Sequence, residues 1–196
     1  MGIRLSSVLL SFLLLFGCGT SEESSDAPLV VTTTDPFRAI VAPIVGDRAG
    51  VKALLPPGAS PHTYEPRPSD MRMIASAEAF IYGAPQLDGW AARMESPRVA
   101  SMISWVPDSL LMTLEDHGHG GVDPHFWMDP LVVKTLLPHL AEYFCESDAE
   151  SCTVYRQNAE TFGRRLDHLN DSLTAMLAPV RGSAVLLSHP FLGYFA

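Results

Sequence analysis

The order of the first three predicted elements constrains this fold most. Residues 29–34 form a β-branched run, Leu-Val-Val-Thr-Thr-Thr, which is typical of a strand buried on both faces. Residues 37–45 repeat apolar side chains at helical spacing and therefore predict an amphipathic helix. Residues 51–55 form a second apolar run, which a Pro-Pro-Gly sequence breaks sharply. A strand, a helix and a strand in that order predict a parallel βαβ unit and hence an α/β fold.

The rest of the chain continues these patterns. We expect a short helix capped by Ser69 and running to Ala75, strands at 79–82 and 99–103, helices at 87–94, 130–144 and 150–178, and a buried strand at 184–187. Asp129 is predicted to cap the helix that begins at Pro130. The helix at 150–178 carries one apolar seam: Tyr155, Ala159, Phe162, Leu166, Leu169, Leu173 and Met176. Such a seam suits a rigid spine lying across a structure. Coiled-coil dimerisation is the alternative, but the sequence lacks the ordered flanking charge pairs typical of a coiled coil.

The first residues are typical of an exported protein. Arg4 precedes an apolar run that is too short to span a bilayer, so residues 1–17 are predicted to be a signal peptide. The run ends in Leu-Phe-Gly-Cys, which resembles a bacterial lipobox and would make Cys18 the lipid-bearing residue; an ordinary signal peptide with an incidental cysteine is the alternative. Residues 18–27 are small, polar and acidic, and predict a flexible tether. We therefore expect a location in the periplasm or on the cell surface, with a lipid anchor.

Charge and cysteine content narrow the classes of function. The chain has a formal net charge of −9 and no basic cluster, which disfavours nucleic-acid binding and agrees with a cation as partner. Cys145 and Cys152 lie at the junction of two predicted helices, and an exported location permits a disulfide between them. A zinc-binding cysteine pair is the rival interpretation, but a second pair is missing from the sequence.

Three histidines fall on predicted loops where a ligand could be held. His62 and His189 each follow a predicted strand, and open α/β sheets bind ligands at the carboxyl ends of their strands. His125 lies in the sequence Asp-Pro-His-Phe-Trp-Met-Asp-Pro at 123–130, whose prolines stiffen the loop. A stiffly held imidazole suits a metal ligand, although a single histidine beside aromatic residues is more often a packing residue. His117 and His119 lie in a Gly-spaced loop that predicts at most weak metal contact.

The three histidine motifs, in this order, resemble those of the metal-binding components of zinc and manganese ABC importers, and of the zinc-type periplasmic protein in particular. They occupy residues 57–62 with 68–70, residues 123–130, and residues 188–195. The resemblance implies that His62, His125 and His189 are metal ligands, that Zn²⁺ is the transported ligand, and that the protein is not an enzyme. An ABC-type permease in the membrane is the implied partner.

The resemblance also implies two α/β lobes joined by a long rigid helix, with the metal between them. Residues 28–148 would then be a parallel-sheet N-terminal metal-binding lobe, and residues 149–180 the linker helix. Residues 183–196 would be the first strand and loop of a C-terminal lobe. The rest of that lobe, with the acidic fourth ligand usual in such proteins, is not encoded up to Ala196.

Three alternatives stay open at this point. A manganese-binding member of the same family is one, although three imidazoles suit zinc better and manganese-type relatives tend to carry an acid at the position of His189. A three-histidine zinc hydrolase is the second; its general base would be Glu65, and the sequence has no His-Glu-x-x-His pattern. A surface adhesin or a structural lipoprotein is the third, and its histidines would be dispensable for metal binding.

Overall fold

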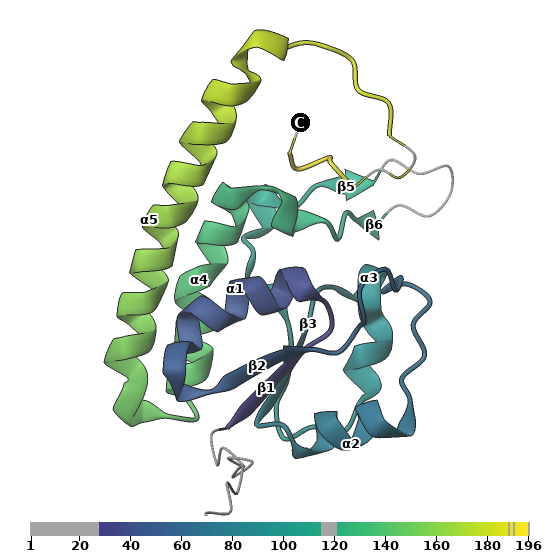
Figure 1. Cartoon of the computed structure of the whole chain (residues 1–196), viewed down its shortest axis with the longest axis vertical. Coiled ribbons are helices and arrows are strands. Elements are labelled where there is room, and N and C mark those ends of the chain that lie inside the picture. The colour runs from purple at the N-terminus through teal and green to yellow at the C-terminus, as the bar shows by residue number, and fades with distance from the viewer. Residues whose placement is uncertain (1–27, 115–120, 188, 190, 196) are drawn as a thin grey trace, which may run out of the picture.

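The computed structural model describes residues 28–114, 121–187, 189 and 191–195, and it has the predicted α/β architecture (Figure 1). Four parallel strands form one sheet in the order β2-β1-β3-β4, and two further strands form an antiparallel pair. The strands are β1 Leu29–Thr32, β2 Gly50–Ala53, β3 Ala79–Tyr82, β4 Val99–Ser101, β5 Thr113–Leu114 and β6 Gly121–Val122. The α-helices are α1 Asp35–Val45, α2 Pro68–Ser76, α3 Pro85–Asp88, α4 Pro130–Cys145 and α5 Cys152–Leu177.

The parallel sheet is covered on both faces, as its apolar strands require. Val30 and Ile81 face a core formed with α1, α4 and the first half of α5. Val31 and Phe80 face the opposite core, formed with α2 and the loops around it. Helix α5 packs outside α4 and α1, so it lies against the lobe as an additional layer (Figure 1). Alternate residues of one strand thus enter two different cores, which explains the continuous hydrophobic runs in the sequence.

The helix starts follow from local sequence, with one correction. The carboxylate of Asp129 accepts from the backbone N–H of Leu131 at 2.7 Å, so the predicted cap of α4 is confirmed. The prediction that Ser69 caps the helix running to Ala75 is wrong, because this helix, α2, already begins at Pro68. The carboxylate of Asp70 instead accepts from the backbone N–H of Arg67 at 2.8 Å, which ties down the entry to the helix. Proline at the first helical position explains the early start, since its fixed φ suits a helix.

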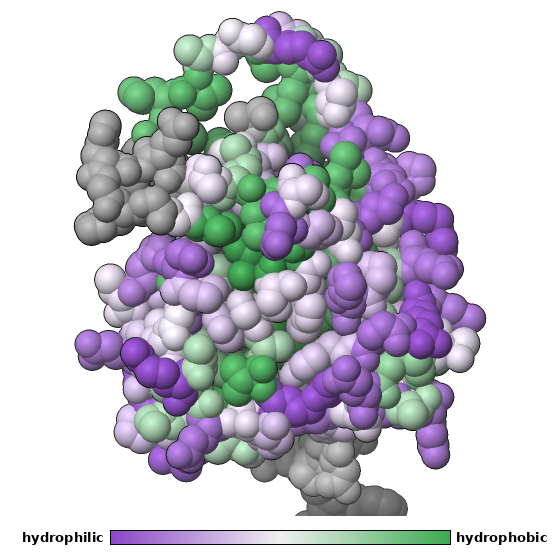
Figure 2. All heavy atoms as spheres, turned by 180° about the vertical axis from the view of Figure 1, so that it is seen from behind, coloured by the Kyte–Doolittle hydropathy of each residue, from purple (hydrophilic) through white to green (hydrophobic). Residues whose placement is uncertain are grey.

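The end of the chain differs most from the prediction. Residues 184–187 were expected to form a buried strand, but they are irregular, and the side chains of Val185 and Leu186 are 74% and 99% exposed. No described strand lies beside them, so their backbone has no ladder to join and their apolar side chains have no sheet to cover. Figure 2 shows hydrophobic side chains gathered at this end of the molecule, near the end of α5. The seam of α5 is buried at Tyr155, Ala159 and Leu166, whereas Leu169 is 46% exposed and Met176 is 72% exposed.

Several predicted features lie outside the described residues. They are the signal peptide at 1–17, Cys18, the tether at 18–27, and the loop histidines His117 and His119. Within the part of the chain that the structure describes, no helix combines the length and hydropathy needed to cross a bilayer.

Asp88 is a fully buried carboxylate that joins the ends of two strands to α3. It accepts from the backbone N–H groups of Gly83 at 3.0 Å and Ala84 at 2.9 Å, and from the hydroxyl of Thr33. Burial raises the pKa of Asp88 above its ordinary value, although these hydrogen bonds oppose the shift.

Asp88→Ala should therefore lower the free energy of unfolding by about 2–3 kcal/mol, because three buried donors lose their acceptor. Urea denaturation would measure the change, and Asp171→Ala, at an exposed position of α5, is the matched control. A loss below about 0.5 kcal/mol would contradict this role for Asp88.

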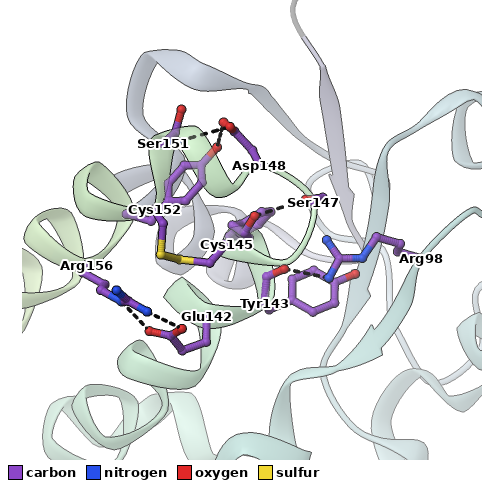
Figure 3. The surroundings of a disulfide bond; sticks show 11 residues. Arg98, Glu142, Tyr143, Cys145, Ser147, Asp148, Ser151, Cys152 and Arg156 are labelled. Carbon is purple, nitrogen blue, oxygen red and sulfur yellow. Dashed lines mark hydrogen bonds and ion pairs between the residues drawn. A yellow bond between two sulfur atoms is a disulfide. The ribbon is translucent and has the colours of Figure 1, made fainter.

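Cys145 and Cys152 form a disulfide in the structure, between the end of α4 and the start of α5 (Figure 3). The two helices are also joined there by a bidentate ion pair in which Arg156 donates to Glu142 at 2.6 and 2.8 Å. Tyr155 donates to Asp148 at 2.8 Å within the same turn. This turn sets the direction in which α5 leaves the lobe.

Reduction of the Cys145–Cys152 bond should lower stability by about 2–3 kcal/mol, because the closed loop is short. The comparison is between oxidised and reduced protein in urea, with Cys145→Ser/Cys152→Ser as a variant that should match the reduced protein. Equal stability of oxidised and reduced protein would contradict the prediction.

Candidate metal centre

The structure brings His62, His125 and His189 together from three separate segments. One ring nitrogen of each residue lies within 4.8 Å of the corresponding nitrogen of the other two. The Nε2 atoms of His125 and His189 are 3.3 Å apart. Two nitrogens that bind the same tetrahedral zinc ion at 2.0–2.1 Å are separated by about 3.3–3.4 Å. The observed spacing of this pair is therefore the spacing that a shared tetrahedral cation requires.

His125 is the buried and most constrained member of the group. It is 5% exposed and lies between β6 and α4, at the start of the 3₁₀ helix Phe126–Met128. Its Nδ1 lies 2.7 Å from the carboxylate of Asp123, and the same oxygen accepts from the His125 backbone N–H at 2.9 Å. A carboxylate accepts but does not donate, so Nδ1 carries the proton and Nε2 keeps its lone pair free for a cation. The ring also packs against Trp127, with their centroids 5.3 Å apart.

His62 is exposed and lies on the loop that follows β2. Trp90 holds this loop by donating its indole N–H to the backbone carbonyl of Pro61 at 3.0 Å. The ring of Tyr64 packs against the same indole at a tilt, with the centroids 5.5 Å apart, and its hydroxyl donates to the carboxylate of Asp70 at 2.7 Å. The backbone on both sides of His62 is therefore anchored while its imidazole stays open to solvent.

His189 is exposed and reaches the site from the opposite direction. The chain leaves α5, crosses back over the lobe and approaches β5 and β6 (Figure 1). Its ring meets that of His125 edge to face, with the centroids 5.2 Å apart, and lies 6.0 Å from that of His62. Two of the converging imidazoles therefore come from loops before α4, and the third comes from the segment beyond α5.

Other candidate residues do not join this group. His139 is exposed on the surface of α4. Among the described residues, no carboxylate or cysteine sulfur comes within 4.8 Å of all three histidine nitrogens, and this includes Glu65. Sequence reasoning assigned no role to Asp123, although the Asp-Pro-His motif contains it. Metal-binding histidines usually donate their second N–H to a carboxylate. An acid two residues before a predicted imidazole ligand therefore could have pointed to Asp123 as the partner of His125.

Three neutral imidazoles with one further position open to solvent can hold a divalent cation of borderline softness. Carboxylate oxygens, which hard cations prefer, are absent from the converging set in the part of the chain that the structure describes. The arrangement can therefore bind a cation and exchange it through the open side.

Comparison with known proteins identifies the family of this chain. The family model described as zinc-uptake complex component A, periplasmic (ZnuA), matches residues 30–196. A putative metal-binding protein of Thermotoga maritima is 32% identical over 168 residues, covering 85% of this chain and 59% of the relative. The manganese-binding lipoprotein MntA of Halalkalibacterium halodurans is 26% identical, covering 96% of this chain and 64% of the relative. This chain thus spans less than two thirds of the length of either relative.

The fold is similar to that of solved structures of the same kind. A crystal structure of ZnuA aligns with a TM-score of 0.72 and 27% identity, covering 87% of this chain and 67% of that one. The family model, which matches residues 30–196, extends over all three histidine motifs. By this match the chain belongs to the ZnuA family of periplasmic metal-binding components of metal-uptake complexes.

Proposed function

We propose that the protein captures Zn²⁺ outside the cytoplasmic membrane and delivers it to an ABC-type permease. The observation that carries the proposal is the convergence of His62, His125 and His189, with two Nε2 atoms at the separation expected for one tetrahedral ion. Membership of the ZnuA family supports transport rather than catalysis. Anchoring through a lipid on Cys18 would keep the protein close to its permease.

Zinc is favoured over manganese by the donor set. Imidazole nitrogen suits zinc, whereas manganese sites use more carboxylate oxygen. The relatives include proteins named for each metal, such as MntA for manganese and the ZnuA of Paracoccus denitrificans for zinc. The choice therefore rests on this chain's own residues, and above all on a histidine at position 189.

Hydrolysis is disfavoured by the same geometry. A zinc hydrolase needs a general base within hydrogen-bond reach of the metal-bound water. Glu65, the nearest candidate in sequence, is not among the groups that converge with the histidines in the described part of the chain.

Calorimetric titration of the purified protein with zinc, and separately with manganese and magnesium, tests the proposal. We expect one zinc ion per chain, bound more tightly than manganese, and no saturable magnesium binding. Saturation by manganese at lower concentration than zinc would favour the manganese alternative. A protein that binds none of these ions would contradict the proposed function altogether.

A further inference from the structure

Tyr194 is a buried residue in an otherwise exposed part of the chain. It lies five residues beyond His189, is 7% exposed and belongs to the core of the first lobe. The preceding segment at 183–187 is irregular and exposed. The segment that carries His189 is therefore anchored to the lobe on its far side, through Tyr194.

The hydroxyl of Tyr194 occupies a place in a β-ladder. Strands β5 and β6 pair antiparallel, and Met112 and Asp123 are the next pair beyond Thr113 and Val122. Asp123 donates its backbone N–H to the carbonyl of Met112 at 2.8 Å, which marks a hydrogen-bonded pair. The reciprocal bond is replaced by the phenol, which accepts from the N–H of Met112 at 2.9 Å and donates to the carbonyl of Asp123 at 3.0 Å. Burial raises the pKa of Tyr194, which keeps the phenol protonated and able to donate.

The ladder position matters because Asp123 also orients His125. The backbone carbonyl of Asp123 accepts from Tyr194. Its carboxylate accepts from the backbone N–H and from Nδ1 of His125. Gly193 lies close to the side chain of Asp123. A Cβ atom added to Gly193 would come within 2.9 Å of Oδ2 of Asp123. Residues 193–194 thus contact the backbone and the side chain of the one residue that sets the direction of His125.

We propose that Tyr194 is a positioning residue that holds His189 in place beside His125, an inference that rests on the proposed metal-binding function. The phenol fixes the segment of His189 to the same residue that fixes His125, so the two imidazoles share one support. The segment between α5 and His189 joins no strand among the described residues, so without the Tyr194 bond it would lose its conformational freedom only when the metal binds. A ligand held in advance binds more tightly, because less ordering remains for the binding step.

Tyr194→Phe tests this inference, because it keeps the ring and removes only the hydroxyl. Zinc affinity should fall about tenfold, the order expected when hydrogen bonds of this kind are lost. In a His189→Ala background the same substitution should leave zinc affinity unchanged, because the segment then supplies no ligand. Tyr143→Phe is the matched control: its hydroxyl is buried and has no hydrogen-bond partner among the described residues, so zinc affinity should equal that of the wild type. Gly193→Ala should reproduce the loss, because the added methyl group would displace the carboxylate of Asp123 or the segment itself.

Each result separates this inference from its rivals. Circular dichroism and thermal unfolding of the metal-free variants establish that the fold is intact. An unchanged affinity of Tyr194→Phe would overturn the inference. An equal loss in the wild-type and His189→Ala backgrounds would also overturn it, because the hydroxyl would then act through His125 alone. If His189→Ala itself binds zinc as tightly as the wild type, the three-histidine site fails and this inference fails with it.

Discussion

Replacing His125 by alanine is expected to weaken zinc binding on the order of a thousandfold, the largest single effect in this protein. His125 is buried, its tautomer is set by Asp123 and its Nε2 is aimed at His189, so little ordering remains when the ion arrives. A thousandfold loss corresponds to about 4 kcal/mol of binding free energy. His62→Ala and His189→Ala should cost less, because both side chains are exposed and their rings still lose some rotamer freedom when the ion binds, whichever way their backbone is held.

Competition titrations against a chelating zinc indicator would measure this series. Asp123→Asn should fall between the ligand variants and the wild type, at about 10–100-fold, because it weakens the support of His125 without removing a ligand. His139→Ala is the matched control, since it removes an exposed histidine of α4 and should leave affinity unchanged. Equal losses for His139→Ala and His125→Ala would contradict the assignment of the site.

Lowering the pH from 7.5 to 5.5 is expected to weaken zinc binding by about two to three orders of magnitude. Histidine changes its charge between about pH 5 and pH 8, and only the neutral imidazole binds a metal. Protons therefore compete with the cation at up to three positions at once. Zinc binding is therefore strongest where all three rings are neutral, and it weakens as the pH falls.

Isothermal titrations in buffers of different ionisation enthalpy would count the protons released on binding. A His62→Ala/His189→Ala variant should show a shallower dependence on pH, since two competing positions are gone. An affinity that stays constant between pH 7.5 and 5.5 would point to carboxylate ligands, whose protonation lies at lower pH.

The parts of this fold that sequence could predict are those with a local cause. The βαβ unit follows from bounded apolar runs, and the start of α4 follows from Asp129 before a proline. His62 and His125 could be predicted as candidate metal ligands because turn-forming residues surround them and because their motifs resemble those of a known family. Neither kind of signal depends on distant residues.

The remaining features depend on contacts between distant segments. The run at 184–187 has the composition of a strand but has no neighbouring strand in the described part of the chain, and composition alone does not supply one. The hydrogen bond from Tyr194 to Asp123 joins residues 71 positions apart, and no periodicity marks either of them. The seam of α5 is continuous in sequence, yet the described lobe covers only the part up to Leu166.

The central claim is that three imidazoles hold the ion, and X-ray absorption at the zinc edge tests it most directly. For the purified protein with one zinc ion per chain, we predict nearest neighbours at about 2.0–2.1 Å and the outer-shell scattering of three histidine rings, with no scatterer at the sulfur distance of about 2.3 Å. His125→Ala should lose the contribution of one ring. A first shell of oxygen without imidazole scattering, or one containing sulfur, would contradict the claim.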